Sequence, residues 1–432
     1  MEQHRIHGKV IRVAPDMYTI DDLEAMKRIY GVASDMPKSD WYAVWSSNGR
    51  KGDNLFSMED RHIHGQMRRK VASMYSMSTI KQYEPYVDKC NRVLMQQFEK
   101  LEAAGQAFDL QSWMQSYAFD VIGEITFSSS VGFMEAGAKD IDNIIKLLDS
   151  LNSFSTIIGI DRGLFPLLYA KFRIPSAGLL TWVAKLSQLR RQSIGKQAPG
   201  TIQDFHSKVD ALKEKDPEGA LLYNVDNTLI QNVAAGSDTT SITLTAILFH
   251  LANNPTIMKK LRSEIMTAIT DGGISSPITF DESQRLPYLA NVIKEGMRLH
   301  PAVGLPLWRV VQEPGLTLAD KFFPPGTVVG INAWVAHYNS QVYGPDVHEF
   351  KPERWDPSIT PAERLMQMER YYLPFGAGTR TCIGKNISIL ELAKVIPELL
   401  RRYEIELISR EMKTQNRWFV KQRDVMVRIR KI

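Results

Sequence analysis

The chain has 432 residues, of which 44% are hydrophobic and 23% charged, a composition typical of a globular protein with a large core. Its two cysteines, Cys90 and Cys382, stand far apart and outside any Cys/His cluster, which excludes a disulfide framework and a zinc site. The formal net charge is only +5 and basic residues are interspersed with acidic ones, so a nucleic-acid partner is not expected.

The N-terminal half is predicted to form short strands followed by long helices. Residues 7–21 are rich in β-branched side chains and contain a proline, a pattern typical of short strands near a sheet edge. From residue 58 to about residue 269, apolar residues recur every three or four positions, which predicts a helical body. We expect helices in the segments 69–75, 86–101, 113–125 and 141–151.

The segment 225–251 predicts a helix that is buried on nearly all sides. Between Thr228 and Leu251 its only charged residue is Asp238, and a helix without a polar face must lie inside the protein. Because a buried carboxylate is unfavourable without a partner or a task, Asp238 is a candidate functional residue.

The C-terminal half mixes helices with short strands. Helices are predicted over 255–269 and 287–299, strand-like pieces such as 327–332 follow in a proline-rich stretch, and a last helix is expected over 384–403. No repeat or linker divides the chain. We therefore predict a single domain over residues 1–432, with a mostly α fold of the α+β class in which small sheets accompany a helix-rich body.

A fixed pattern marks the loop before the last predicted helix. Residues 375–384 read Phe-Gly-Ala-Gly-Thr-Arg-Thr-Cys-Ile-Gly. The glycines permit a tight turn that brings backbone N–H groups close to the sulfur of Cys382, and the start of a helix favours its thiolate form. A lone cysteine such as Cys90 is ordinarily a buried apolar residue, whereas the pattern F-x-x-G-x-R-x-C-x-G sets Cys382 apart from this ordinary case.

With this loop the chain resembles the cytochrome P450 family of haem-thiolate monooxygenases. The resemblance implies the cytochrome P450 fold, with heme b (iron protoporphyrin IX) as cofactor and the thiolate of Cys382 as the axial ligand of the iron. It also places Phe375, Gly376, Arg380 and Gly384 around the cofactor. In such a centre the thiolate pushes electron density toward the iron and favours cleavage of the O–O bond.

The buried helix carries a second signature of the family, A-G-x-D-T-T. The resemblance places Ala235 and Gly236 beside the cofactor and makes Asp238 and Thr239 the catalytic residues, which face the bound oxygen and relay protons where the glycine lets the helix open locally. The alternative is that Thr239 hydrogen-bonds to a carbonyl four residues earlier and that Asp238 forms a salt bridge with a basic neighbour.

A third signature, E-x-x-R, is formed by Glu295 and Arg298, which share one face of the helix 287–299. The resemblance joins them to Arg354 in a buried ion-paired triad. The triad is expected to position the cysteine loop and to have no part in the chemistry. Loss of one member should leave a buried charge without its partner, at about 3–5 kcal/mol.

The propionates of a haem need cationic or N–H donors to be held inside a protein. His64 and Arg68 match the family pattern H-x-x-x-R, and Arg309 and Arg380 occupy two further propionate-binding positions. For His64 and Arg68 the alternative is that they belong to a solvated helix face.

The resemblance implies an enzyme that inserts one oxygen atom of O2 into a hydrophobic small molecule. No flavin-binding domain or glycine-rich nucleotide fingerprint is present, so electrons should come from NADPH through a separate NADPH-cytochrome P450 reductase, with cytochrome b5 as a further donor. The cluster Arg68-Arg69-Lys70, together with Lys385 and Lys394, is expected to dock an acidic partner of this kind.

Two alternatives belong to other functional classes. One is a haem-binding sensor or electron carrier without turnover, and the other is a family isomerase or dehydratase. Neither requires the acid–alcohol pair Asp238–Thr239, so its presence favours the monooxygenase. A requirement for NADPH and a reductase would distinguish them.

The substrate and the location of the protein are predicted from resemblance. The sequence is similar to the fungal pisatin-demethylase-like branch, which implies a terpenoid, polyketide or alkaloid-like substrate in secondary metabolism. The segments expected to line the pocket are 41–56, 155–168, 229–235, 302–305 and 418–419. The family resides on the cytosolic face of the endoplasmic-reticulum membrane. This sequence begins after the family's anchor and first helix, so we expect a soluble or peripheral monomer.

Overall fold

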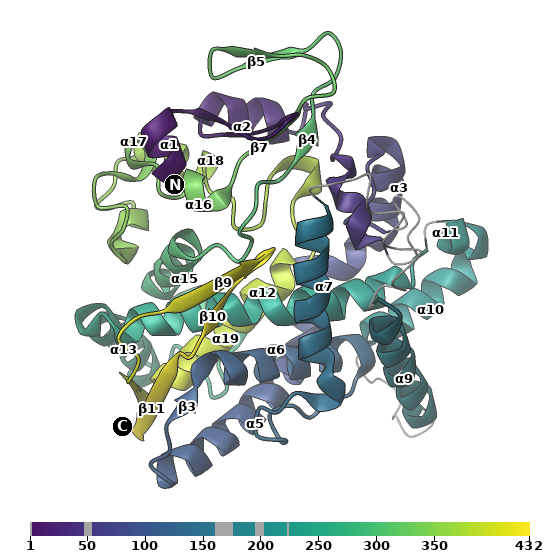
Figure 1. The fold of residues 1–432 in the computed structure, drawn as a ribbon. Helices are drawn as coiled ribbons and strands as arrows, with labels where there is room; N and C mark the ends of the chain where they lie inside the picture. Colours follow the sequence, from purple (N-terminus) through teal and green to yellow (C-terminus); the bar gives the residue numbers. More distant parts are fainter. Residues whose placement is uncertain (1, 47–53, 160–175, 195–202, 223) are drawn as a thin grey trace.

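The computed structural model describes residues 2–46, 54–159, 176–194, 203–222 and 224–432. Helices dominate the fold, and one of them, α12, crosses the middle of the molecule (Figure 1). The α-helices in chain order are α1 Glu2–His7, α2 Leu23–Tyr30, α3 Arg61–Val71, α4 Met77–Ile80, α5 Glu84–Ala103, α6 Leu110–Phe127, α7 Ile144–Ile158, α9 Ser176–Ile194, α10 Phe205–Lys215, α11 Pro217–Leu222, α12 Asn227–Ala252, α13 Pro255–Thr270, α14 Phe280–Ser283, α15 Pro287–Leu299, α16 Ala333–Ala336, α17 Ser340–Tyr343, α18 Ala362–Arg370 and α19 Lys385–Leu400.

Small sheets accompany these helices, as predicted. The largest has the strand order β1-β2-β7-β4, in which β2 and β7 are parallel, and the others are β3-β11-β8, β9-β10 and β5-β6. The strands are β1 Val10–Ala14, β2 Met17–Ile20, β3 Phe108–Asp109, β4 Arg309–Val310, β5 Leu316–Leu318, β6 Lys321–Phe323, β7 Val328–Gly330, β8 Tyr403–Leu407, β9 Lys413–Arg417, β10 Phe419–Arg423 and β11 Met426–Lys431.

Helix α12 confirms the predicted buried helix. It packs against α6, α15, α19 and strand β10, so most of its side chains are removed from solvent. A hydrogen bond of 3.0 Å between the hydroxyls of Thr240 and Ser388 joins it to α19. The helix therefore lies directly beside the helix that follows the cysteine loop.

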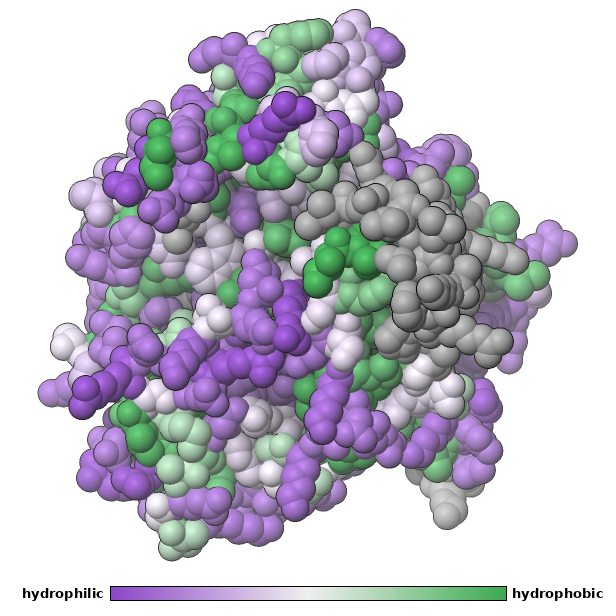
Figure 2. Space-filling view, in the orientation of Figure 1, coloured by the Kyte–Doolittle hydropathy of each residue, from purple (hydrophilic) through white to green (hydrophobic). Residues whose placement is uncertain are grey.

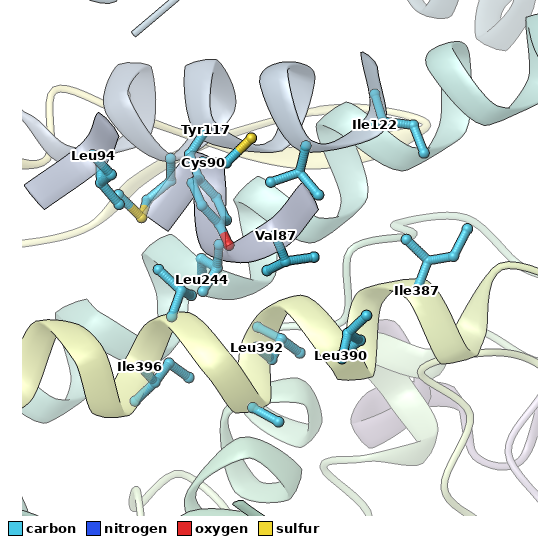
Figure 3. Close-up of a cluster of buried hydrophobic side chains, with 14 of the residues drawn as sticks. Val87, Cys90, Leu94, Tyr117, Ile122, Leu244, Ile387, Leu390, Leu392 and Ile396 are labelled. Atoms are coloured by element: carbon cyan, nitrogen blue, oxygen red, sulfur yellow. The ribbon is translucent and has the colours of Figure 1, made fainter. Parts of the chain in front are cut away.

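The main hydrophobic core lies between α5, α6, α12 and α19 (Figure 3). Val87, Tyr117, Leu244 and Leu392 are fully buried in it, and each such side chain contributes about 1.5–3 kcal/mol to folding. Cys90 is 2% exposed and packs among them, which confirms that it is a buried apolar residue.

Two local predictions differ from the structure, and one element was not addressed by the sequence analysis. That element is α1, formed by residues 2–7, none of whose side chains is buried. The predicted helix 69–75 divides, because α3 ends at Val71 and a 3-10 turn covers Ala72–Tyr75. The last helix ends at Leu400, and the chain then forms four strands that were not predicted. Strand β9 has no apolar residue, whereas β8 and β11 alternate apolar and charged residues, a strand signal that the sequence analysis missed. Among the described residues, no helix is long and apolar enough to cross a membrane.

Candidate functional site

Cys382 lies at the end of a tight loop that leads into α19. Gly376 and Gly378 adopt positive φ angles of 68° and 63°, which non-glycine residues rarely adopt. A Cβ on Gly378 would also overlap the carbonyl oxygen of Tyr30. The N–H of Cys382 donates to the carbonyl of Phe375 at 2.8 Å and closes the loop. The glycine pattern therefore fixes the cysteine just ahead of the helix.

The surroundings of the Cys382 sulfur combine burial with positive charge. The side chain is accessible to solvent although it lies deep in the protein. Burial raises the pKa of the thiol, whereas the N–H groups of Gly384 and Lys385 and the guanidinium of Arg68 act to lower it. N–H groups at a helix start and a nearby cation are the features that stabilise a thiolate, and a bound cation strengthens them further. The donor set suits a metal that prefers one sulfur ligand.

The four predicted propionate-binding side chains gather near this loop, together with Lys38, which the sequence analysis missed. Burial and the charges of Arg380, Lys38, Arg68 and Arg309 lower the pKa of His64 to about 3. Burial, followed by Arg309, lowers the pKa of Arg380 to about 10, and burial with Arg309 and Arg380 lowers that of Lys38. Buried like charges of this kind need anionic partners.

Backbone carbonyls orient these cations. Arg380 donates to two carbonyl oxygens, of Met58 at 2.6 Å and of Glu59 at 3.0 Å. Lys38 donates to the carbonyl of Phe56, with its Nζ 4.1 Å from the centre of that ring, and a single β-bridge places it opposite Arg309. Only the fold brings Lys38 to the cluster, because no motif surrounds it in the sequence.

The triad Glu295, Arg298 and Arg354 is assembled as predicted. Arg298 donates to both oxygens of Glu295, at 2.8 and 2.9 Å, and the Nε of Arg354 lies 3.3 Å from one of them. Trp355 and the N–H of Lys351 complete the hydrogen bonding of the carboxylate, at 2.9 and 3.1 Å. Glu295 and Arg298 are fully buried, so the triad is an internal structural element.

Asp238 and Thr239 adopt the alternative arrangement described from the sequence. The hydroxyl of Thr239 donates to the carbonyl of Ala235 at 2.8 Å, because a threonine inside a helix satisfies its hydroxyl most easily on the preceding turn. Asp238 is buried, accepts a hydrogen bond from Gln115 and lies 3.2 Å from the Nζ of Lys421. Helix α12 is continuous through this turn, so the expected local opening is not observed.

The two small residues of the signature have different surroundings. A Cβ on Gly236 would lie 3.2 Å from the side chain of Ile122, so this glycine lets α6 and α12 pack closely. Ala235 is exposed and Thr239 half-buried on a helix that is otherwise covered. These two residues are one turn apart, and the face that they share is left open by neighbouring elements. This open face and the accessible Cys382 lie on elements that contact each other.

The segments predicted to line a substrate pocket partly converge. Trp41 and Trp418 lie 5.1 Å apart between ring centroids, and Trp45 and Phe56 join the same aromatic cluster. A β-bridge between Val303 and Phe419 adds a third segment. Residues 47–53 and 160–168 of the predicted segments lie outside the described residues. The convergence builds a packed aromatic cluster from distant parts of the chain, in which Trp45 and Phe56 are half-buried.

One prediction about the basic surface is wrong. Lys394 is fully buried, because its ammonium is paired with Glu84 and Asp88 at 3.0 Å each. It therefore cannot dock a partner. Arg69 and Lys385 are exposed, whereas Lys70 is engaged by Asp216.

These features together define a class of protein. A single thiolate at a helix start, an adjacent buried helix with an uncovered face, and a cluster of buried and half-buried cations fit a haem. The Cys382 sulfur would be the ligand of its iron, and the cations would meet its two propionates. The residues that would hold the propionates are His64, Arg68, Arg309 and Arg380, together with Lys38. The residues present are those of a haem-thiolate protein.

Comparison with known proteins assigns this class to a family. The family described as Cytochrome P450 matches residues 2–428. A cytochrome P450 monooxygenase from Aspergillus terreus is 36% identical over 93% of this chain and 84% of its own length. A pisatin demethylase from Fusarium vanettenii is 34% identical, over 98% and 83%. A crystal structure of a cytochrome P450 (CYP102L1) has a TM-score of 0.81 at 20% identity and covers 100% of this chain and 93% of that chain. The chain belongs to the cytochrome P450 family.

Family membership makes this chain a monooxygenase, which uses O2, a redox partner and a small-molecule substrate. The resemblance to fungal enzymes that include pisatin demethylase is confirmed. The likeness to the solved structure confirms the cytochrome P450 fold.

Proposed function

We propose that this monooxygenase forms one catalytic domain that oxidises a hydrophobic natural product in fungal secondary metabolism. The relatives support this source, since they are fungal P450 monooxygenases. Trp45 and Phe56, the half-buried members of the aromatic cluster, offer an apolar wall and so support an apolar substrate, because aromatic side chains bury large apolar areas. A terpenoid, polyketide or alkaloid-like scaffold would suit such a wall.

The position of Cys382 carries the proposal. The N–H groups of Gly384 and Lys385 and the positive charge of Arg68 act on its sulfur, and no other described cysteine has comparable surroundings, since Cys90 is buried among apolar residues. A haem bound there supplies oxygen activation. The protein's own residues hold the sulfur, neutralise the propionates, exclude water and bring protons to the site.

In the proposed reaction, side chains of α12 deliver the protons. We assign their delivery to Asp238 and Thr239, with the hydroxyl of Thr239 as donor after rotation away from the Ala235 carbonyl. Electrons come from NADPH through a separate NADPH-cytochrome P450 reductase, with cytochrome b5 as a further donor. Arg69 and Lys385 are the exposed cations that would meet an acidic partner.

Spectroscopy of the purified protein tests the ligand. The reduced carbon monoxide complex should show the far red-shifted Soret band of thiolate ligation, and Cys382→Ser should abolish this band while Cys90→Ser keeps it. Survival of the band in Cys382→Ser would refute the assignment.

Isotope labelling then tests the reaction. With NADPH, a reductase and ¹⁸O2, one labelled oxygen atom should enter the product. Product formation without NADPH would instead favour an isomerase or dehydratase, and haem reduction without any product would favour an electron carrier.

A further inference from the structure

Lys421 lies between two carboxylates that belong to different helices. Its Nζ is 3.2 Å from Asp238 on α12 and 2.9 Å from Asp149 on α7. Asp238 is 2% exposed at its side chain, whereas Asp149 is 25% exposed. One ammonium on β10 thus joins a buried carboxylate inside the protein to a second carboxylate near the surface.

The same three residues line a small cavity. A narrow cavity with room for about one water molecule is lined by Asp238, Lys421, Asp149 and Phe419. It shares Asp149 and Arg417 with an open groove between α7 and the β9–β10 hairpin. In Figure 1 this hairpin lies in front of α12 and beside α7, and Figure 2 shows hydrophilic side chains gathered over it. The buried carboxylate therefore borders a cavity that lies next to a surface groove.

We propose that Lys421 is a positioning residue that controls protonation of Asp238, and that protons enter from the groove past Asp149. The proposal rests on the proton-delivery role assigned to Asp238. The two carboxylates share one ammonium, so a proton that adds to an oxygen of Asp238 leaves Lys421 paired with Asp149. The neutral carboxyl is then free to turn toward the open face of α12. One proton moves from solvent to Asp238, and the charge of the three groups changes from −1 to 0.

Other groups around Asp238 are polar or more distant. Gln115 of α6 donates to its carboxylate, and Ser241 of α12 donates to its backbone carbonyl at 2.9 Å. Arg423 of β10 lies 3.9 Å from Asp149. From β9, Arg417 lines the cavity.

The sign of each influence on Asp238 follows from charge. Burial raises the pKa of Asp238, Lys421 acts to lower it and Asp149 acts to raise it. Removing Lys421 should therefore raise this pKa, and removing the charge of Asp149 should lower it. Opposite shifts of this kind show that the two charges act on Asp238, and only a matching change in turnover assigns the ion pair a part in proton delivery.

Infrared spectroscopy of the ferric holoenzyme tests the ion-pair arrangement without turnover. The carbonyl stretch of protonated Asp238 is identified as the band missing from Asp238→Asn. Its titration midpoint should move to higher pH in Lys421→Met and to lower pH in Asp149→Asn. Lys413→Met, which is the same change at an exposed position of the same hairpin, should leave the midpoint unchanged.

The pH dependence of turnover tests proton entry. Product formation should fall as pH rises through the pKa of Asp238, because the acid must be protonated to deliver. The pH at which product formation falls should be higher in Lys421→Met and lower in Asp149→Asn than in the parent. If the infrared titration midpoints of the two variants are the same, the role of Lys421 is refuted. If these midpoints differ while the pH at which product formation falls does not move, the entry route is refuted. Unchanged product formation in Asp238→Asn would instead refute the proton-delivery role of Asp238.

Discussion

The hydroxyl of Thr239 donates a hydrogen bond to the carbonyl oxygen of Ala235, 2.8 Å away. The hydroxyl is thus occupied within its own helix in this structure, on the face of α12 that other elements leave open. Rotation about χ1 exchanges this bond for one directed away from the helix, since threonine in helices divides between two rotamers.

Replacing Thr239 should uncouple the enzyme without unfolding it. Thr239→Val keeps the shape and removes the hydroxyl, so haem content and the substrate-induced spectral shift should persist. NADPH consumption should be diverted to hydrogen peroxide, with product yield reduced by a factor on the order of 10²–10³, the scale of losing a positioned proton donor. Thr243→Val is the matched control, because Thr243 bonds to the Thr239 carbonyl in the same way at 3.0 Å. Equal coupling in both variants would contradict a chemical role for Thr239.

The buried triad should contribute much more to the free energy of unfolding than a partly exposed ion pair does. Glu295→Gln removes the charge that compensates Arg298 and Arg354, so the free energy of unfolding should fall by about 3–5 kcal/mol. Chemical denaturation followed by haem absorbance measures this difference. The pair Lys260–Glu353 is partly exposed, and Lys260→Met should change the stability by less than about 1 kcal/mol. Similar losses in the two variants would mean that the triad contributes no more than a surface pair.

The Lys38 side chain should slow the dissociation of haem. Lys38→Met removes one charge-assisted hydrogen bond to a propionate, a loss of about 1.5–3 kcal/mol, so haem should dissociate faster by a factor of about 10 to 100. Transfer of haem to an acceptor protein gives this rate directly. Lys27→Met, at an exposed position of α2, should dissociate at the parental rate. A Lys38→Met rate equal to that of the control would place Lys38 away from the cofactor.

Glu391 should make stability depend on pH. The carboxyl on α19 is 1% exposed, and burial raises its pKa well above the usual value. The folded protein therefore binds a proton that the unfolded chain releases near pH 4.3, so stability falls as pH rises from that value through the folded-state pKa. Glu391→Gln should flatten this fall and unfold at higher denaturant than the parent at pH 8. A pH dependence in Glu391→Gln that equals or exceeds that of the parent would contradict the assignment.

The sequence alone determined the features that depend on local spacing. Glu295 and Arg298 share a helix face because they are three residues apart, and the glycines before Cys382 are required by the turn that presents its sulfur. The charge-poor run around Asp238 identified the buried helix, because such a segment cannot face water. These patterns were enough to predict the fold class, the family and the thiolate.

Tertiary structure decided which distant groups meet. Lys421 and Lys394 lie in unremarkable sequence, yet one reaches Asp238 from a C-terminal strand and the other is buried between two carboxylates of α5. Lys38 joins Arg309 only because β4 and the segment before Trp41 are neighbours in the fold. The partners of a charge depend on contacts between elements far apart in the chain, and no local pattern encodes them. For the same reason the sequence proposed a role for Asp238, whereas only the structure revealed the lysine that holds it.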